Sequence, residues 1–233
     1  MSHDENRRRF LHAAMNGTGL LAVGATALGA EPEKKAEESP EDVSPAEDLM
    51  REHGLLNRVL LIYGEAISRL EDNRDLPAVP LESSAKIIQT FIEDYHEKLE
   101  EDHLFPRFEK AGVLVELTKV LREQHAAGRR TTNTILALAN DRAIKNADDR
   151  HKLVTSLQEF VRMYRPHEAR EDTILFPALH SIVSRNEYDS LGEQFEDEEH
   201  KRFGEEGFEK MVDKVAGIEK ELGIYDLAQF TPK

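Results

Sequence analysis

Two stretches of the chain repeat the same arrangement of histidine, glutamate and a Leu-Phe-Pro triplet. One begins at His96 and the other at His167, which is an offset of 71 residues (167 minus 96). In each stretch a glutamate follows the histidine by four residues, at Glu100 and Glu171. Residues four apart on a helix project from the same face about one turn apart, so each pair can reach one metal ion or bridge two.

A single histidine precedes each of these stretches. His53 lies 43 residues before His96, and His125 lies 42 residues before His167. Two halves related by a pseudo-twofold axis would bring four imidazoles and two carboxylates together, a ligand set suited to iron or manganese. The carboxylates would then bridge two ions and the histidines would be terminal ligands. The chain has no cysteine, which excludes thiolate zinc sites and thiolate-ligated iron–sulfur clusters.

All six candidate ligands fall on otherwise apolar helix faces. Burying a carboxylate or an imidazole without a partner costs several kcal/mol, and a metal pair would compensate all six together. The alternative is a structural helical protein in which each histidine is an ordinary core residue. That alternative requires a separate hydrogen-bonding partner for every one of them.

Apolar residues at helical spacing predict four long helices, over residues 49–70, 81–110, 113–141 and 148–184. The stripe on the fourth places His167, Glu171 and Ile174 on one inward face. A fifth helical stretch is expected over 187–222, with a break near Gly204–Gly207. No pattern indicates a strand, so we expect an all-α fold, an antiparallel up-down four-helix bundle over 46–185 with a C-terminal helical extension over 186–233.

The duplicated His-Glu-x-x-Glu and Leu-Phe-Pro pattern resembles that of the hemerythrin-like, or His-His-Glu cation-binding, family over roughly residues 46–185. The resemblance implies a non-haem centre of two iron ions joined by a bridging oxo or hydroxo group, with manganese or zinc as less favoured occupants. Carried over by matching positions, the ligands it implies are His53, His96, Glu100, His125, His167 and Glu171.

The chain departs from the oxygen-carrying members of that family at two positions. Arg129 stands four residues after His125, where those proteins have a further histidine. Asp172 stands five after His167, where they have a bridging aspartate, but the internal repeat favours Glu171 as the bridge. These departures disfavour simple reversible oxygen carriage.

Several other polar residues have open roles. Asp172, His103 and His200 are candidates for additional metal ligands or for hydrogen-bonding partners of ligands, and each of the two histidines is equally well read as a surface residue. Three tyrosines, equally well read as core residues, are candidate donors to the site: Tyr63, Tyr95 and Tyr164.

The first thirty residues resemble a twin-arginine export signal. Arg7-Arg8-Arg9-Phe10-Leu11 precedes a weakly hydrophobic stretch rich in glycine and alanine, which predicts a signal over 1–30 and a periplasmic location. The alternative is a frayed arm or a short packed helix. Residues 31–45, rich in Glu, Lys, Pro and Ser, read as a disordered linker.

The composition argues against two kinds of partner, nucleic acids and membranes. A net charge of −15 argues against nucleic acid and anionic lipid as partners. No apolar run approaches the roughly 20 residues that span a bilayer, so no membrane association is expected after signal cleavage.

The favoured function is the binding or turnover of dioxygen, peroxide or nitric oxide by a sensor, scavenger or weak oxidase. The alternative is a module that binds or senses iron or another divalent cation without catalysis and signals to an unidentified protein partner.

Overall fold

Every regular element that the structure describes is a helix. The computed structural model describes residues 43–232, and no strand occurs within that range, which confirms the all-α class for this part of the chain. The export signal predicted over 1–30, and the linker as far as residue 42, lie outside the described residues. Between residues 43 and 232 no helix combines the length and the apolar character needed to cross a bilayer.

The helices follow the stretches expected from the sequence, with short interruptions. In chain order the main elements are α2 (Pro45–Glu71), α3 (Ala78–Ile87), η1 (Ile88–His96), α4 (Glu97–Leu99), η2 (Glu100–Leu104), α5 (Phe105–Ala111), α6 (Val115–Leu138), α7 (Asp141–Lys145), α8 (Ala147–Arg170), η3 (Glu171–Leu175), α9 (Phe176–Ile182), α10 (Arg185–Phe203), α11 (Gly207–Glu221) and η4 (Leu227–Phe230).

Helix ends coincide with the residues that favour them. The hydroxyl of Ser44 accepts a hydrogen bond from the backbone N–H of Glu47 at 3.2 Å and caps the start of α2. The break expected in the fifth stretch is present between α10 and α11. There Gly204 has a φ of 75° and Glu206 a φ of 63°, so the chain passes through left-handed backbone between the two helices.

Two π-helical segments begin at the candidate carboxylate ligands. η2 begins at Glu100 and η3 at Glu171, with the same offset of 71 residues as the sequence repeat. Pro106 and Pro177 follow these segments. A proline has no N–H and its ring clashes with the carbonyl four residues earlier, so a wider π turn accommodates it inside a helix.

The π turn corrects one expectation about the inward face. Ile174 was predicted to face inward, but it is 44% exposed, whereas the next residue, Leu175, is fully buried. The regular 3.6-residue period that placed Ile174 inward does not hold across η3, because a π turn contains an additional residue.

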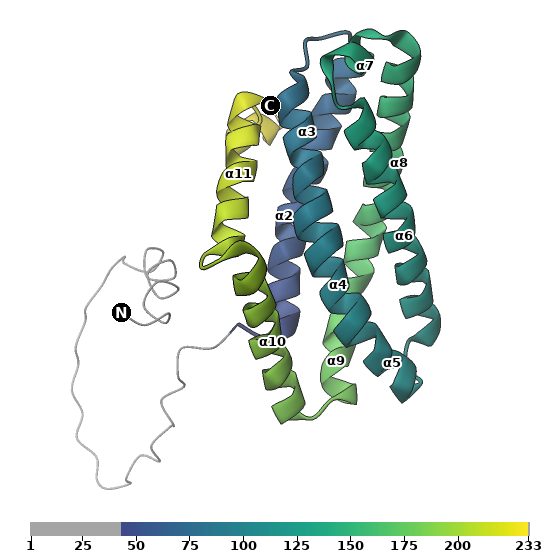
Figure 1. Cartoon of the computed structure of the whole chain (residues 1–233), viewed down its shortest axis with the longest axis vertical. Coiled ribbons are helices and arrows are strands. Elements are labelled where there is room, and N and C mark those ends of the chain that lie inside the picture. Colours follow the sequence, from purple (N-terminus) through teal and green to yellow (C-terminus); the bar gives the residue numbers. More distant parts are fainter. Residues whose placement is uncertain (1–42, 233) are drawn as a thin grey trace, which may run out of the picture. The chain divides into compact units, whose positions relative to one another are not determined.

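The helices that carry the candidate ligands lie side by side. α2 packs against α8, α8 against α6, and α6 against α3 and η1 (Figure 1). The C-terminal segment contacts this group through α2: α10 and α11 both pack against it, and α11 also packs against α3. An ion pair joins α2 to α11, with Nη2 of Arg58 2.6 Å from Oε2 of Glu219.

Candidate metal centre

Four buried imidazoles meet in two pairs. Nε2 of His53, on α2, lies 3.0 Å from Nε2 of His96, at the end of η1. Nε2 of His125, on α6, lies 3.2 Å from Nε2 of His167, on α8. None of the four side chains is more than 3% exposed. The structure therefore brings together all four histidines that the sequence singled out as ligands.

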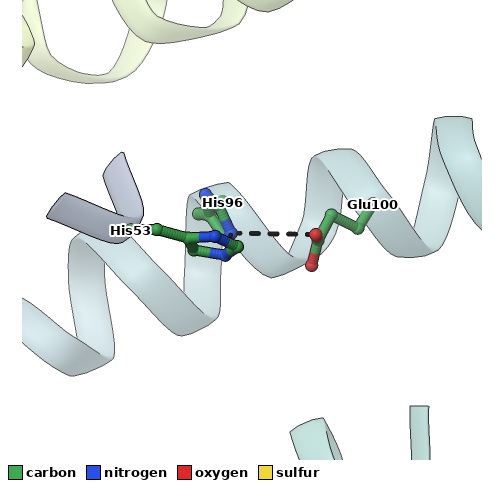
Figure 2. Close-up of side chains that lie close together, drawn as sticks. All are labelled: His53, His96 and Glu100. Carbon is green, nitrogen blue, oxygen red and sulfur yellow. Dashed lines mark hydrogen bonds and ion pairs between the residues drawn. The ribbon is translucent and has the colours of Figure 1, made fainter. Parts of the chain in front are cut away.

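Glu100 faces one imidazole from each repeat. Its Oε1 lies 3.8 Å from Nε2 of His96 and its Oε2 lies 3.4 Å from Nε2 of His125. Figure 2 shows His53 and His96 pointing toward each other, with the Glu100 carboxylate on the side of His96. Glu100 is fully buried, so its carboxyl group has no contact with solvent.

Glu171 makes the reciprocal approach. Its Oε2 lies 3.1 Å from Nε2 of His167, in its own repeat, and 3.4 Å from Nε2 of His53, in the other. It is also fully buried. Each carboxylate thus stands between the two halves of the site, which is the position that a bridging ligand requires.

Each imidazole has a hydrogen-bond acceptor at its other nitrogen. The distances from Nδ1 are 2.7 Å for His53 to Asp172, 2.6 Å for His96 to Glu52, 3.1 Å for His125 to Glu101 and 2.8 Å for His167 to Oε1 of Gln124. Because an ionised carboxylate or an amide oxygen only accepts, a neutral imidazole beside it carries its proton on Nδ1 and directs the Nε2 lone pair toward the centre. Proteins orient histidine ligands of metals in this way. Against the effect of burial, Asp172 and Glu171 raise the pKa of His53 well above its usual value, and Glu97 and Glu100 raise that of His125 to about 10, so a metal ion would displace a proton from these two.

The hydrogen-bond acceptors of the four imidazoles stand in matching positions of the two repeats. Glu52 and Gln124 each directly precede the lone histidine of their repeat, and Glu101 and Asp172 lie 71 residues apart. Sequence reasoning singled out Asp172 but gave no role to the other three. The signal was present, since the residues flanking the lone histidines and the glutamates stand in matching positions.

Phenylalanine from each Leu-Phe-Pro triplet packs on a histidine of the opposite repeat. Phe105 stacks on His125 and Phe176 on His53, in both cases with ring centroids 5.5 Å apart. The sequence indicated a packing role for these residues at the end of the bundle. The structure gives them a specific one, because each ring fixes the plane of an imidazole and keeps water from that face.

Arg129 occupies the place of the histidine found in oxygen carriers, and it binds carboxylates instead. Its Nη2 lies 2.8 Å from Oε2 of Glu97 and 2.8 Å from Oε1 of Glu101. Glu97 also accepts a hydrogen bond of 2.6 Å from the hydroxyl of Tyr164. The arginine therefore neutralises the acceptor that orients His125 and supplies no metal ligand.

Asn57 is the counterpart of Arg129, four residues after the lone histidine of the first repeat. Its amide nitrogen donates a hydrogen bond to Oε2 of Glu168. Burial, followed by the negative charge of Asp172, raises the pKa of Glu168 to about 8. The two repeats thus differ here, with a cation in one and a neutral amide in the other.

The electrostatics of the centre favour a cation. Burial, and then the negative charge of Glu171, raise the pKa of Glu100 to about 8. Burial, and then the positive charge of His53, hold the pKa of His96 well below its usual value. Within the described part of the chain, the oxygens of Glu100 and Glu171 make no hydrogen bond of good geometry, although the charges of His167 and His53 hold the pKa of Glu171 well below its usual value against the effect of burial. Such buried acceptors are costly, so four Nε2 lone pairs and two carboxylates fit a pair of metal ions.

The remaining candidates lie outside the centre. The ring of His103 packs against that of Phe195, with centroids 5.8 Å apart. Within residues 43–232, neither His103 nor His200 belongs to a group of acidic and histidine side chains that can hold a metal ion. Asp172, whose side chain is 34% exposed, reaches the centre only through His53. Tyr63, Tyr95 and Tyr164 are all buried.

An all-helical protein with buried His/Glu clusters that can bind metal is the class that this fold and site define. Residues 44–179 match the hemerythrin HHE cation binding domain family. Because this match covers more than half of the sequence, the chain belongs to that family. It is also similar to Rv1995 of Mycobacterium tuberculosis (strain H37Rv) and Mb2018 of Mycobacterium bovis. Each is 49% identical over 232 residues, which cover 97% of this chain and 91% of the relative. No solved structure matches the chain.

Proposed function

We propose that this chain is a non-haem two-iron protein that binds or turns over a small oxidant: dioxygen, peroxide or nitric oxide. The observation that carries the proposal is the position of Glu100 and Glu171. Each lies between histidines of both repeats, and among the described residues the only groups that approach its oxygens are these imidazoles, without a hydrogen bond of good geometry. A carboxylate so placed can bridge two ions, each completed by imidazole nitrogens.

The antiparallel up-down four-helix bundle is part of the same proposal. Its support is the contact of α2 with α8, of α8 with α6, and of α6 with α3. One ligand segment comes from each stretch, so the bundle interior is where the four imidazoles meet. Short connections between the stretches favour antiparallel neighbours.

When bound, the iron pair supplies redox chemistry and open coordination positions, because six protein ligands do not complete the coordination of two ions. The chain's own residues orient four Nε2 lone pairs and exclude water. The rings of Phe105 and Phe176 stack on His125 and His53. Asp172, the partner of His53, is partly exposed, so the site is nearest to solvent at His53. Arg129 replaces a nitrogen ligand, which favours oxidant chemistry over reversible oxygen carriage.

Metal analysis and optical spectra of the aerobically purified full chain test the proposal. We expect two iron ions per chain, the near-ultraviolet absorption of a bridged ferric pair, and a spectral change when peroxide or nitric oxide is added. One metal ion per chain, or zinc alone without that absorption, would contradict it. Manganese in place of iron would keep the site and change its chemistry.

A second candidate is a cation-binding or cation-sensing module without catalysis. The observation that favours it is the attachment of the C-terminal segment to α2, the helix that carries His53, through Arg58 and Glu219. A change at His53 on metal binding could pass along α2 to α11 and so to a protein partner. An iron centre with neither turnover nor a spectral response to peroxide or nitric oxide would support this candidate over the first.

Export to the periplasm is a separate proposal, supported by Arg7-Arg8-Arg9-Phe10-Leu11 and the mild hydrophobic stretch after it. By resemblance, the twin-arginine route carries folded proteins with their cofactors already in place. Replacement of Arg7 and Arg8 by lysine should abolish export. Fractionation and N-terminal sequencing of the exported form would check this, and equal export of the variant would refute it.

A further inference from the structure

A second group of buried acidic side chains lies between α2 and α10. Asp48 and Glu52 come from successive turns of α2, and Glu199 comes from α10. One oxygen of each lies within 4.8 Å of the others, and the three residues are 8%, 1% and 3% exposed. Nη1 of Arg51 lies 3.5 Å from Oδ1 of Asp48 and compensates part of the negative charge of the group. Carboxylates this close and this deep repel one another and lose their hydration, so a cation bound among all three would stabilise the group.

Two unpartnered polar atoms point to a ligand at this place. Oε2 of Glu52 is hydrogen-bonded to Nδ1 of His96. Its Oε1 is buried and has no hydrogen-bonding partner. The hydroxyl of Tyr95 is also buried and faces Glu52, but it does not reach the length and angle of a normal hydrogen bond. Buried polar atoms in native proteins normally have partners, and a metal ion accepts both of these oxygen types.

Glu199 is held in position from its other side. Its Oε1 accepts a hydrogen bond of 3.0 Å from the backbone N–H of Phe208, at the start of α11. The absence of a side chain at Gly207 permits this approach, because a Cβ there would lie 2.9 Å from the same oxygen. The turn between α10 and α11 thus holds the carboxylate of Glu199 beside Asp48 and Glu52 of α2.

We propose that Asp48, Glu52 and Glu199 form a third metal site, which binds a hard divalent cation such as Mn²⁺ through oxygen ligands alone. Ligand distances of about 2.0–2.6 Å place oxygens around one ion up to about 5 Å apart, which matches the spacing of this group. With no nitrogen or sulfur donor among them, the three carboxylates favour ions of the magnesium and manganese type.

The third site is coupled to the His/Glu centre through Glu52. One oxygen of this carboxylate would bind the outer cation while the other accepts the Nδ1 proton of His96. Occupancy of either site therefore changes the electron density that Glu52 offers to the other, and the coupling is reciprocal. The proposal does not depend on which metal fills the centre.

Equilibrium dialysis of the chelator-treated full chain against Mn²⁺, followed by metal analysis, tests the proposal. We expect the wild type to bind one equivalent more than Glu199→Gln and Asp48→Asn. Glutamine at position 199 keeps the acceptor for Phe208, so α11 stays capped while the charge is lost. Glu193→Gln is the matched control, because Glu193 is an exposed residue of α10 with the same charge. It should bind as many equivalents as the wild type.

The difference of one equivalent is the decisive result. Three equivalents in the wild type and two in the variants support both the third site and the two-metal centre. One in the wild type and none in the variants supports the third site and contradicts the centre. Equal stoichiometry in the wild type and in both variants, with their thermal unfolding still cooperative, overturns the third site.

Discussion

The carboxylate of Glu52 lies 2.6 Å from Nδ1 of His96, and the equivalent position of the second repeat offers Gln124, whose amide oxygen lies 2.8 Å from Nδ1 of His167. One imidazole thus faces a carboxyl group, whose pKa burial and then the charge of Asp48 raise well above its usual value, and the other faces a neutral amide. When Glu52 is ionised it draws the Nδ1 proton more strongly than an amide does and makes Nε2 a better electron donor. The two halves of the centre are alike in geometry and unequal in ligand strength.

Removing the acceptor at position 52 should weaken metal binding, and glutamine should largely rescue it. Glu52→Leu leaves Nδ1 of His96 buried without a partner, so affinity for the pair should fall by about 10–100-fold. Glu52→Gln reproduces the arrangement at Gln124 and should cost less than about tenfold. Competition against a chelator of known affinity measures both. An affinity for Glu52→Leu equal to that of the wild type would show that the hydrogen bond does not orient the ligand.

Neutralising the two bridging candidates should have different effects on the metal-free protein. Glu100→Gln removes a buried carboxyl group whose pKa is raised to about 8, so the chelated protein should be as stable as the wild type or more so, by about 1–3 kcal/mol. Glu171→Gln removes a carboxylate whose pKa the neighbouring His167 and His53 hold well below its usual value against the effect of burial, so the chelated protein should lose stability. The same variants should lose bound iron and the stabilisation it brings.

Thermal unfolding with and without iron checks this prediction. Asp102→Asn is the matched control, because Asp102 is an exposed acid two residues after Glu100. Its unfolding temperature should follow that of the wild type in both conditions. Full iron content in both variants would mean that the carboxylates are incidental to the site.

The sequence predicted the helices and the six candidate ligands because both depend on local spacing. His53, His96, Glu100, His125, His167 and Glu171 could be selected from a repeat and an apolar stripe alone. The partners of their Nδ1 atoms also stand in matching positions of the repeat, but spacing alone does not say which acceptor meets which imidazole. The acceptor for His53 is Asp172, which lies 119 residues away. The exposure of Ile174 was missed for a different reason: a π turn changes the helical period, and proline signals such a turn only indirectly.

The hydrogen bond between Tyr164 and Glu97 depends on a glycine. A Cβ at Gly128 would lie 2.1 Å from the hydroxyl of Tyr164, so Gly128→Ala must displace the ring. We expect a loss of about 1–3 kcal/mol in the free energy of unfolding, measured with urea. The loss should be smaller when Tyr164 is phenylalanine, because the closest atom is then absent. Gly64→Ala is the control: nothing lies within 4 Å of its Cβ, and α2 should gain up to about 1 kcal/mol.

Glu93 should make the stability of the protein fall as the pH rises. Burial is the largest cause of the rise in its pKa to about 7, and its Oε1 has no hydrogen-bonding partner. The folded state therefore holds the proton more tightly than the unfolded chain. Folding takes up a proton between pH about 4.5 and about 7, so the free energy of unfolding decreases through that window and stays reduced above it.

Glu93→Gln removes this titration, and its effect on stability should depend on pH. At pH 8 the variant of the chelated protein should be more stable than the wild type by about 1–3 kcal/mol, while at pH 5 the difference should be small. Urea unfolding at the two pH values measures the change, with Asp94→Asn, an exposed neighbour, as the control. A Glu93→Gln effect that is the same at both pH values would mean that Glu93 is ionised in the folded protein throughout. A cation would then have to stabilise the Glu93 carboxylate. Arg129 is the residue to replace next, because its charge lowers the pKa of Glu93.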